Sequence, residues 1–291
     1  MAASTARTPS IDLEYNLNSS FDGQAKDFDQ RTGLPDSACR PIADAVLESV
    51  QQPGQTVAHM IEVGAGTGQI GQHFHRQDIN YKGIDYSSEM LEVFKSRLDE
   101  QSIATGDAFE LVHADGRERW PIDSQSIDLV FSSRAIHLFE PQHFSQELCR
   151  VASSAGLMLV AGRRKRDKSS VPAIMRSQMR SFLGEQGIKG RNGQNPVKNL
   201  IEPLEQMAEL KQLDSITVTS WTTQRSPLDS IQSWREKEGL AGLQVEVETK
   251  RMILKQLESW ATEQFGDIST KSTVNESYVL ELLKIRPVKQ G

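Results

Sequence analysis

A glycine-rich segment with an acidic residue beside it is the part of the chain best suited to binding a ligand. Residues 61–68 have the sequence IEVGAGTG and stand between a short apolar run and a stretch with helical spacing. Glycines at such a junction let the backbone turn tightly and approach a ligand without a Cβ in the way. The N-terminus of a following helix would add unpaired amides that attract a polar or anionic group. We therefore expect a ligand-binding turn here.

The glycine spacing leaves two classes of ligand open. Gly66, Gly68 and Gly71 satisfy the G-x-G-x-x-G spacing of dinucleotide-binding proteins. Counted from Gly64, the pattern is instead G-x-G-x-G, with Glu62 two residues before it. A carboxylate at that position would repel a pyrophosphate but suits a ligand that carries an ammonium or sulfonium group.

Four segments of the chain, in order, resemble the motifs of class I S-adenosylmethionine-dependent methyltransferases of the small-molecule, methyltransferase type 11-like kind. They are IEVGAGTG at 61–68, GIDYS at 83–87, HADG at 113–116, and the strand, helix and strand region at 127–139 and 148–162. The resemblance covers about Val57 to Gly162, with a weaker match over the last two strands. It implies a methyltransferase whose cofactor is S-adenosyl-L-methionine. An NAD(P)-dependent oxidoreductase and a non-catalytic methyltransferase-like binding protein are the alternatives.

The resemblance also implies which residues bind the cofactor. Glu62 would recognise its methionine end, Asp85 would bind both ribose hydroxyls, and Asp115 would accept a hydrogen bond from the adenine amine. The full set of expected cofactor residues is Glu62, Gly64, Ala65, Gly66, Asp85, Tyr86, Asp115, Gly116, Arg31 and Ser132.

Residues 21–35, FDGQAKDFDQRTGLP, resemble the cap helix of small-molecule members of this family. In such a helix Phe28 would cover the cofactor, and Arg31 would pair with the cofactor carboxylate through a charge-assisted contact. The alternative is that Phe28 belongs to the core and Arg31 to the surface.

Acceptor-binding residues are expected beyond the carboxyl ends of the strands, where ligands of open α/β sheets lie. His137 is the candidate general base because its ordinary pKa is near neutrality; its alternative role is packing or a backbone hydrogen bond. Arg163 and Arg164 open the basic run 163–166, which either attracts an anionic acceptor or is a solvated loop. Residues 171–183 form either core or a lid over an apolar acceptor. We expect methylation of an anionic or apolar small molecule, at oxygen or nitrogen.

Alternating apolar runs and helical stretches must position these groups. Together with the resemblance they predict an α/β, Rossmann-like sheet of seven strands with an antiparallel last strand, helices on both faces and a helical cap. The expected strands are 56–63, 81–84, 109–113, 127–132, 156–161, 215–221 and 277–285, and the expected helices include 197–210, 243–265 and one that follows the glycine turn to about residue 76.

Length and composition set the remaining expectations. With 291 residues, the chain is predicted to hold a flexible arm at 1–20 and a single domain at 21–291, with cap elements at 21–52 and 165–200. The net charge of −6 disfavours nucleic acid as a partner. No membrane-length or signal-like apolar run occurs, so we expect a cytoplasmic protein. The spacing of the cysteines and histidines predicts no metal site.

Overall fold

The computed structural model describes residues 25–50, 59–75, 79–188, 195–237, 239–240 and 243–288. The arm predicted at 1–20 lies outside these residues. None of the helices within the described ranges combines the length and apolar character needed to cross a bilayer.

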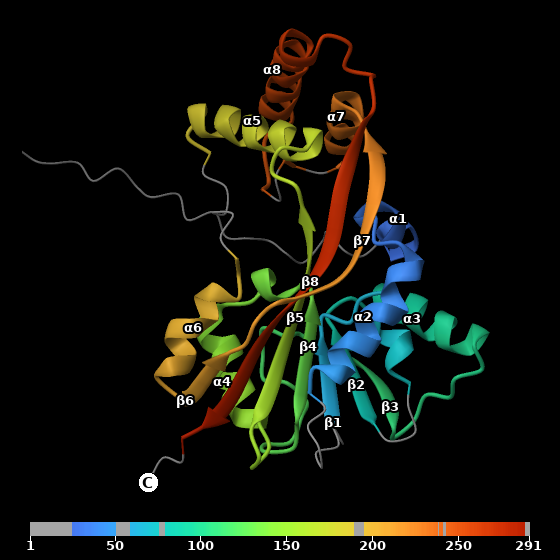
Figure 1. Ribbon diagram of the computed structural model, residues 1–291, viewed down its shortest axis with the longest axis vertical. Coiled ribbons are helices and arrows are strands. Elements are labelled where there is room, and N and C mark those ends of the chain that lie inside the picture. Colours follow the sequence, from blue (N-terminus) through green and yellow to red (C-terminus); the bar gives the residue numbers. More distant parts are fainter. Residues whose placement is uncertain are drawn as a thin grey trace, which may run out of the picture.

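A central sheet of eight strands organises the described residues (Figure 1). Five strands run parallel in the order β3-β2-β1-β4-β5, and β8 then pairs with β5 in the antiparallel direction. Both β6 and β7 pair with β8, also antiparallel. The strands are β1 His59–Val63, β2 Asn80–Asp85, β3 Phe109–His113, β4 Leu129–Ser133, β5 Leu157–Arg166, β6 Ala208–Gln212, β7 Ile216–Arg225 and β8 Ser272–Pro287.

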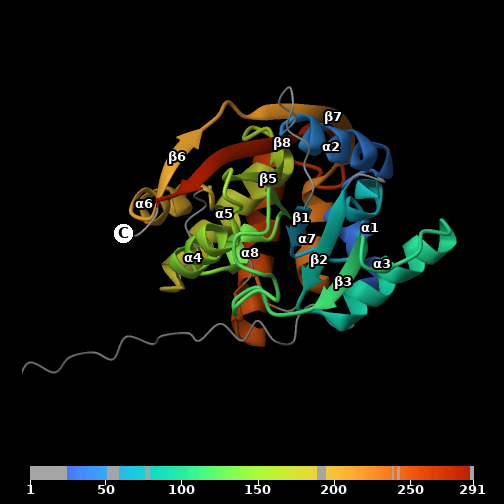
Figure 2. The same ribbon diagram turned by 90° about the horizontal axis from the view of Figure 1, so that it is seen from below.

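Helices cover both faces of the sheet, as parallel strands require, because both faces of such strands are apolar. One apolar core lies under α2 and α3, and a second lies under α4 and α6 on the opposite face (Figure 2). These helices are α2 Asp36–Glu48, α3 Ser88–Glu100, α4 Pro141–Val151 and α6 Lys198–Glu205. The short elements are η2 Ala25–Asp27, α1 Phe28–Thr32, η3 Gly71–Phe74 and η4 Ile136–Leu138.

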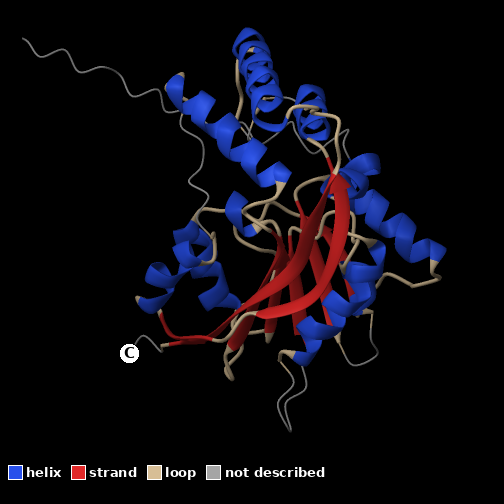
Figure 3. Cartoon of the chain, turned by 45° about the horizontal axis from the view of Figure 1, so that its top comes forward, coloured by secondary structure: helices blue, strands red, loops and turns tan. Residues whose placement is uncertain are grey.

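Three further helices form a separate group at one end of the molecule (Figures 1 and 3). They are α5 Val171–Glu185, α7 Pro227–Glu236 and α8 Val247–Phe265, and they share a third apolar core. The long strands β5, β7 and β8 run out of the sheet to reach them. We call α5, α7 and α8 the cap helices. The division into one domain with cap elements 21–52 and 165–200 stays a prediction.

The structure confirms the predicted α/β class, the antiparallel last strand and the helices on both faces, but it corrects three details. The sheet has eight strands rather than seven, because residues 208–212 pair with β8 instead of ending the helix predicted at 197–210. The glycine turn leads only into the short η3, not into an α-helix. The basic run is not a loop, because β5 continues to Arg166 through its pairing with β8.

Candidate functional site

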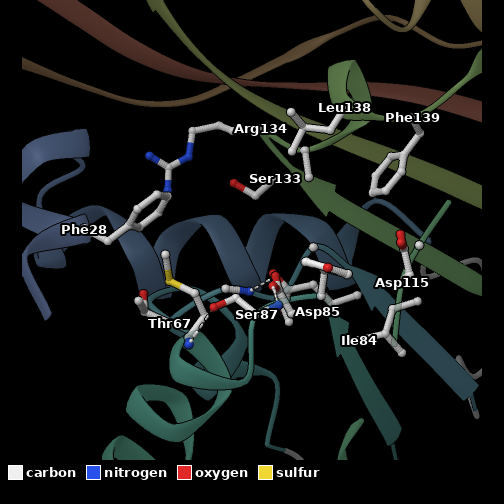
Figure 4. Close-up of a pocket in the computed structure, with 18 of the residues that line it drawn as sticks. Phe28, Thr67, Ile84, Asp85, Ser87, Asp115, Ser133, Arg134, Leu138 and Phe139 are labelled. Atoms are coloured by element: carbon white, nitrogen blue, oxygen red, sulfur yellow. Dashed lines mark hydrogen bonds between the residues drawn. The ribbon is translucent and has the colours of Figure 1, made fainter. Parts of the chain in front are cut away.

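A cavity of about 290 Å³ opens where β1, β2 and β4 end. After β1 the chain continues to β2 on one side, and after β4 it continues to β5 on the other. Ligands of open α/β sheets bind at such a switch point. Phe28 and Arg134 stand at one end of the cavity, Asp115 and Phe139 at the other, and Asp85 between them (Figure 4). The cavity is therefore elongated.

The glycine turn forms the floor of this cavity. The amides of Gly64 and Ala65 donate to the carbonyl of Ile84 at 2.9 and 3.0 Å, which ties the turn to β2. Gly64 has φ +78°, and a Cβ there would lie 2.5 Å from the Cβ of Ala135. Gly66 has φ +57°, and a Cβ there would meet nothing within 4 Å. Side chains are thus excluded at Gly64 by packing, whereas the Gly66 backbone faces open space.

Asp85 lies at the end of β2 and binds two backbone amides. Its Oδ2 accepts from the Gly66 amide at 2.8 Å and its Oδ1 from the Ser87 amide at 2.9 Å. Burial raises the pKa of Asp85 above its ordinary value, while these two donors oppose the rise. Because a carboxylate has about four acceptor positions, Asp85 can still accept hydrogen bonds from a ligand in the cavity.

Glu62 lies in β1, and its side chain reaches the cavity from a buried position. Its Oε2 accepts a hydrogen bond of 2.6 Å from the hydroxyl of Tyr81. Burial raises the pKa of Glu62 to about 8, with a smaller contribution from Asp85, and the Tyr81 hydrogen bond opposes the rise. The Glu62 carboxyl group therefore titrates much closer to neutral pH than an exposed glutamate does.

Asp115 and Arg117 close the far end of the cavity. The guanidinium of Arg117 donates to both Asp115 oxygens, with Nη2 2.6 Å from Oδ2 and Nε 2.9 Å from Oδ1. This pairing holds the pKa of Asp115 below its ordinary value. The Arg117 guanidinium also lies 5.2 Å from the centre of the Tyr86 ring, a cation–π arrangement. Phe139 packs on the backbone of Gly116, where a Cβ would lie 2.7 Å from Cε1 of that ring.

The first helix, α1, covers the other end. Phe28 lines the cavity, and the guanidinium of Arg134 lies 5.9 Å from the centre of its ring. Asp29 fixes the helix in place, because its Oδ1 accepts from the Thr67 hydroxyl at 2.7 Å and its Oδ2 pairs with Arg97. Arg31 belongs to α1, but its side chain is outside the described residues.

On the acceptor side, two adjacent serines of β4 face different ways. Ser132 is fully buried and donates to the carbonyl of Val63 at 2.8 Å, so it does not line the cavity. Ser133 does line it, and its hydroxyl lies 2.6 Å from that of Tyr278 on β8. His137 is exposed and lines the cavity from η4.

Arg163 and Arg164 do not line the cavity. Arg163 pairs with Glu281 and Arg164 with Glu276, both on β8, and the two arginines point to opposite faces because side chains alternate along a strand. Their predicted contact with the acceptor stays a prediction.

The structure brings together ten residues that the sequence singled out, namely Phe28, Glu62, Gly64, Ala65, Gly66, Asp85, Tyr86, Asp115, Gly116 and His137. It adds others that sequence reasoning had not assigned to the site, including Thr67, Met90, Leu138 and Phe139. All but Met90 lie inside the segments quoted above, so proximity to a motif could have indicated them. Only the fold shows which of them face the cavity.

Gly68 and Gly71, which the dinucleotide spacing requires, serve packing instead. A Cβ at Gly68 would lie 2.0 Å from the Phe94 ring, and one at Gly71 would lie 2.6 Å from Glu62 Oε2. Neither glycine lines the cavity, and no α-helix follows the turn in the described residues to present its amides to a pyrophosphate. These observations disfavour the oxidoreductase alternative.

Comparison with known proteins agrees with this geometry. Residues 61–160 match the model of the methyltransferase domain family. Ajmaline N-methyltransferase from Rauvolfia serpentina is 25% identical over 201 residues, which are 66% of this chain and 65% of that protein. An uncharacterized methyltransferase of Mycobacterium tuberculosis strain H37Rv is 27% identical over 97 residues, 33% of this chain and 36% of that one. The chain thus spans less than two thirds of the length of these relatives.

A solved structure shares the fold. The YcgJ protein of Bacillus subtilis superposes with a TM-score of 0.52 at 12% identity, over 84% of this chain and 98% of that chain. The sheet order, the cavity at its switch point and the family match together identify residues 61–160 as a methyltransferase domain. The chain thus resembles methyltransferases over these residues and over the longer stretch that matches ajmaline N-methyltransferase.

Proposed function

We propose that this chain transfers a methyl group from S-adenosyl-L-methionine to a small-molecule acceptor, at nitrogen or oxygen. The observation that carries the proposal is the placement of three carboxyl groups along one elongated cavity. Glu62 lies beside Gly71, which follows the glycine turn, and is close enough to Arg134 for the charge of that residue to act on it. Asp85 lies at the middle of the cavity and Asp115 at the far end (Figure 4). A cofactor with an ammonium group, a ribose diol and an adenine amine presents hydrogen-bond donors in the same order.

The cavity wall supplies what each part of that cofactor needs. Asp85 has free acceptor capacity for the two ribose hydroxyls, and the open space above Gly66 admits the ligand close to the backbone. At the adenine end, Gly116 and Phe139 form a flat apolar wall beside Asp115. At the methionine end, Phe28 covers the cavity, and Arg134 places a guanidinium where a carboxylate would bind it. Arg31 remains the second candidate for that contact.

The acceptor would approach from the side of β4 and η4. When bound, the cofactor supplies an electrophilic methyl group, so the protein has mainly to align the acceptor with it. Ser133 and His137 border the cavity there, and His137 would take a proton from a hydroxyl or ammonium acceptor. The name of the Rauvolfia relative denotes N-methylation of ajmaline, which supports nitrogen as the acceptor atom.

Titration with S-adenosylhomocysteine tests the cofactor assignment. Asp85→Ala removes the ribose contact and the anchor of the Gly66 amide, and we expect it to weaken binding by about 1–3 kcal/mol, roughly the value of a charged hydrogen bond. Asp99→Ala, which removes an exposed carboxylate on α3, is the matched control and should bind as the wild type does. Calorimetry on all three proteins gives the affinities.

The same titration separates the alternatives. Equal affinity of Asp85→Ala and wild type would place the ribose elsewhere, and binding of NADH without binding of S-adenosylhomocysteine would favour the oxidoreductase. Incubation with S-adenosylmethionine and a panel of small amines and alcohols tests catalysis through the release of S-adenosylhomocysteine. Binding without release against every compound would favour the non-catalytic binding protein.

A further inference from the structure

Five arginines lie on β5, β7 and α5, toward the cap side of the sheet (Figure 1). Arg164 and Arg166 lie on β5, Arg225 ends β7, and Arg176 and Arg180 lie on α5. The pKa of Arg166 is lowered by burial and by the charges of Arg164 and Arg225. Arg176 and Arg180 are exposed residues of α5, and the pKa of Arg176 is lowered by partial burial of its charged group and by the charges of Arg166, Arg180 and Arg164. Arg164 and Arg166 both pair with Glu276, and the charge effects connect the other three guanidinium groups to them. These five residues are here called the arginine cluster.

Among the described residues, Glu276 is the carboxylate that contacts the arginine cluster. Glu276 has a fully buried side chain, pairs with Arg164, and lies 3.3 Å from Arg166 Nε. Its Oε1 also accepts from the hydroxyl of Thr223 at 3.2 Å. Asp167, the acid next along the chain, is turned to the amide of Ser169 instead. The cluster therefore keeps a large excess of positive charge.

Two members of the arginine cluster lie on the same face of the sheet as Ser133 of the cavity, further along β5. Arg164 and Arg166 are paired across β8 with Tyr278 and Glu276, so they share the face of Tyr278, whose hydroxyl contacts Ser133. Ser133 is paired with Gly162 on β5. Arg166 lies four residues further along that strand, a distance of about 13 Å at the usual rise per residue.

Resting on the methyl transfer proposed above, we propose that the arginine cluster binds an anionic group, a phosphate or a carboxylate, at the far end of an elongated acceptor. The methylated atom would lie beside Ser133 and His137, about 13 Å away along β5. Guanidinium groups suit this role because they bind both kinds of anion through two parallel hydrogen bonds. An anion would also relieve the repulsion among the arginines. Two members of the cluster lie on α5, the helix that contains residues 171–183, for which the sequence left a lid as one of two roles.

Inorganic phosphate is the probe for this site. The full chain, saturated with S-adenosylhomocysteine, is titrated with phosphate at constant ionic strength, and the midpoint of thermal unfolding is followed. We expect a saturable rise in the wild type and a half-saturating concentration about tenfold higher in Arg176→Gln, the effect of one charged hydrogen bond. Arg251→Gln, which removes an exposed arginine of the cap helix α8, should behave as the wild type does.

Two results would overturn the inference. One is that phosphate does not raise the unfolding midpoint of the wild type. The other is that Arg176→Gln, Arg251→Gln and the wild type share the same half-saturating phosphate concentration. The midpoint of thermal unfolding without phosphate shows whether Arg176→Gln is folded. Arg225→Gln provides an independent test if Arg176→Gln is not. A parallel titration with succinate shows whether the site prefers a carboxylate to a phosphate.

The outcome is separable from that of the proposed function. Binding of S-adenosylhomocysteine without a phosphate response rejects the anionic acceptor and leaves the methyltransferase proposal standing. The chain could instead respond to phosphate, with a weaker response in Arg176→Gln, and yet not bind S-adenosylhomocysteine. That result rejects the proposed function, and with it the assignment of the anion to an acceptor.

Discussion

Glu62 shows how the fold changes the chemistry of one side chain. A glutamate two residues before a glycine turn was expected to be a carboxylate that attracts a cation. Burial instead raises the pKa of this carboxyl group to about 8, although the hydrogen bond from the Tyr81 hydroxyl opposes the rise. The charge that Glu62 presents to the cavity therefore depends on pH.

This pKa predicts a pH dependence of stability. Between the ordinary value of 4.5 and about 8, the native chain binds a proton at Glu62 that the unfolded chain releases. The free energy of unfolding should therefore fall as pH rises through this window, by an amount of a few kcal/mol. Glu62→Gln keeps an acceptor for the Tyr81 hydroxyl but cannot titrate, so its unfolding free energy should fall less over the same range.

Urea denaturation of both proteins at several pH values between 5 and 8.5 measures the difference. Parallel pH profiles for wild type and Glu62→Gln would contradict the assignment of this titration to Glu62. A profile that steepens in the variant would contradict it as well.

At the scale of elements, α1 is a short helix held to the cavity by few contacts. Asp29 joins it to the glycine turn through Thr67 and to α3 through Arg97. Because a five-residue helix has little stability of its own, these bonds determine where Phe28 lies.

Asp29→Ala should therefore loosen the cover of the cavity. We expect an affinity for S-adenosylhomocysteine about three- to tenfold lower, which corresponds to a loss of roughly 1 kcal/mol for the partly buried hydrogen bond. Glu48→Ala, at an exposed position on the neighbouring α2, controls for the loss of a carboxylate. Calorimetric titration of the two variants measures the effect, and equal affinities would show that α1 does not cover the ligand.

At the scale of the whole molecule, the cap helices have their own core. Leu257 of α8 is fully buried there with Met175 and Ile253, and none of the residues that line the cavity belongs to this core. The strands β5, β7 and β8 connect the two parts. Cofactor binding and packing of the cap helices are thus spatially separate.

Leu257→Ala tests this separation. The lost side chain should lower the free energy of unfolding by about 2–5 kcal/mol, the usual cost of such a cavity. The affinity for S-adenosylhomocysteine at a temperature where the variant is folded should stay within about twofold of wild type. Chemical denaturation and calorimetry give both numbers, and a large loss of affinity would show that the cap helices also shape the cofactor site.

Much of the parallel sheet and of the cofactor side could be predicted from the sequence. The turn at Gly64, the acid at Asp85 and the HADG segment each lie within a few residues of the strand that positions them, so local sequence was enough. The edge strand β6 was missed because its residues alternate weakly, and it forms only where β8 supplies its hydrogen bonds. Only the fold decides that Ser133 and not Ser132 lines the cavity, because a shift of one residue along a strand reverses the face.

By itself, the sequence determined the class of fold, the position of the glycine turn and the order of the carboxyl groups that follow it, because contiguous segments encode them. Only the tertiary structure decided the environment of the basic residues. Arg164 and Glu276 are 112 residues apart in the sequence, yet the pairing of β5 with β8 joins them in one ion pair. Three more arginines, on β7 and α5, add their charges to the same region. Long-range strand pairing creates such a cluster, and no local pattern records it.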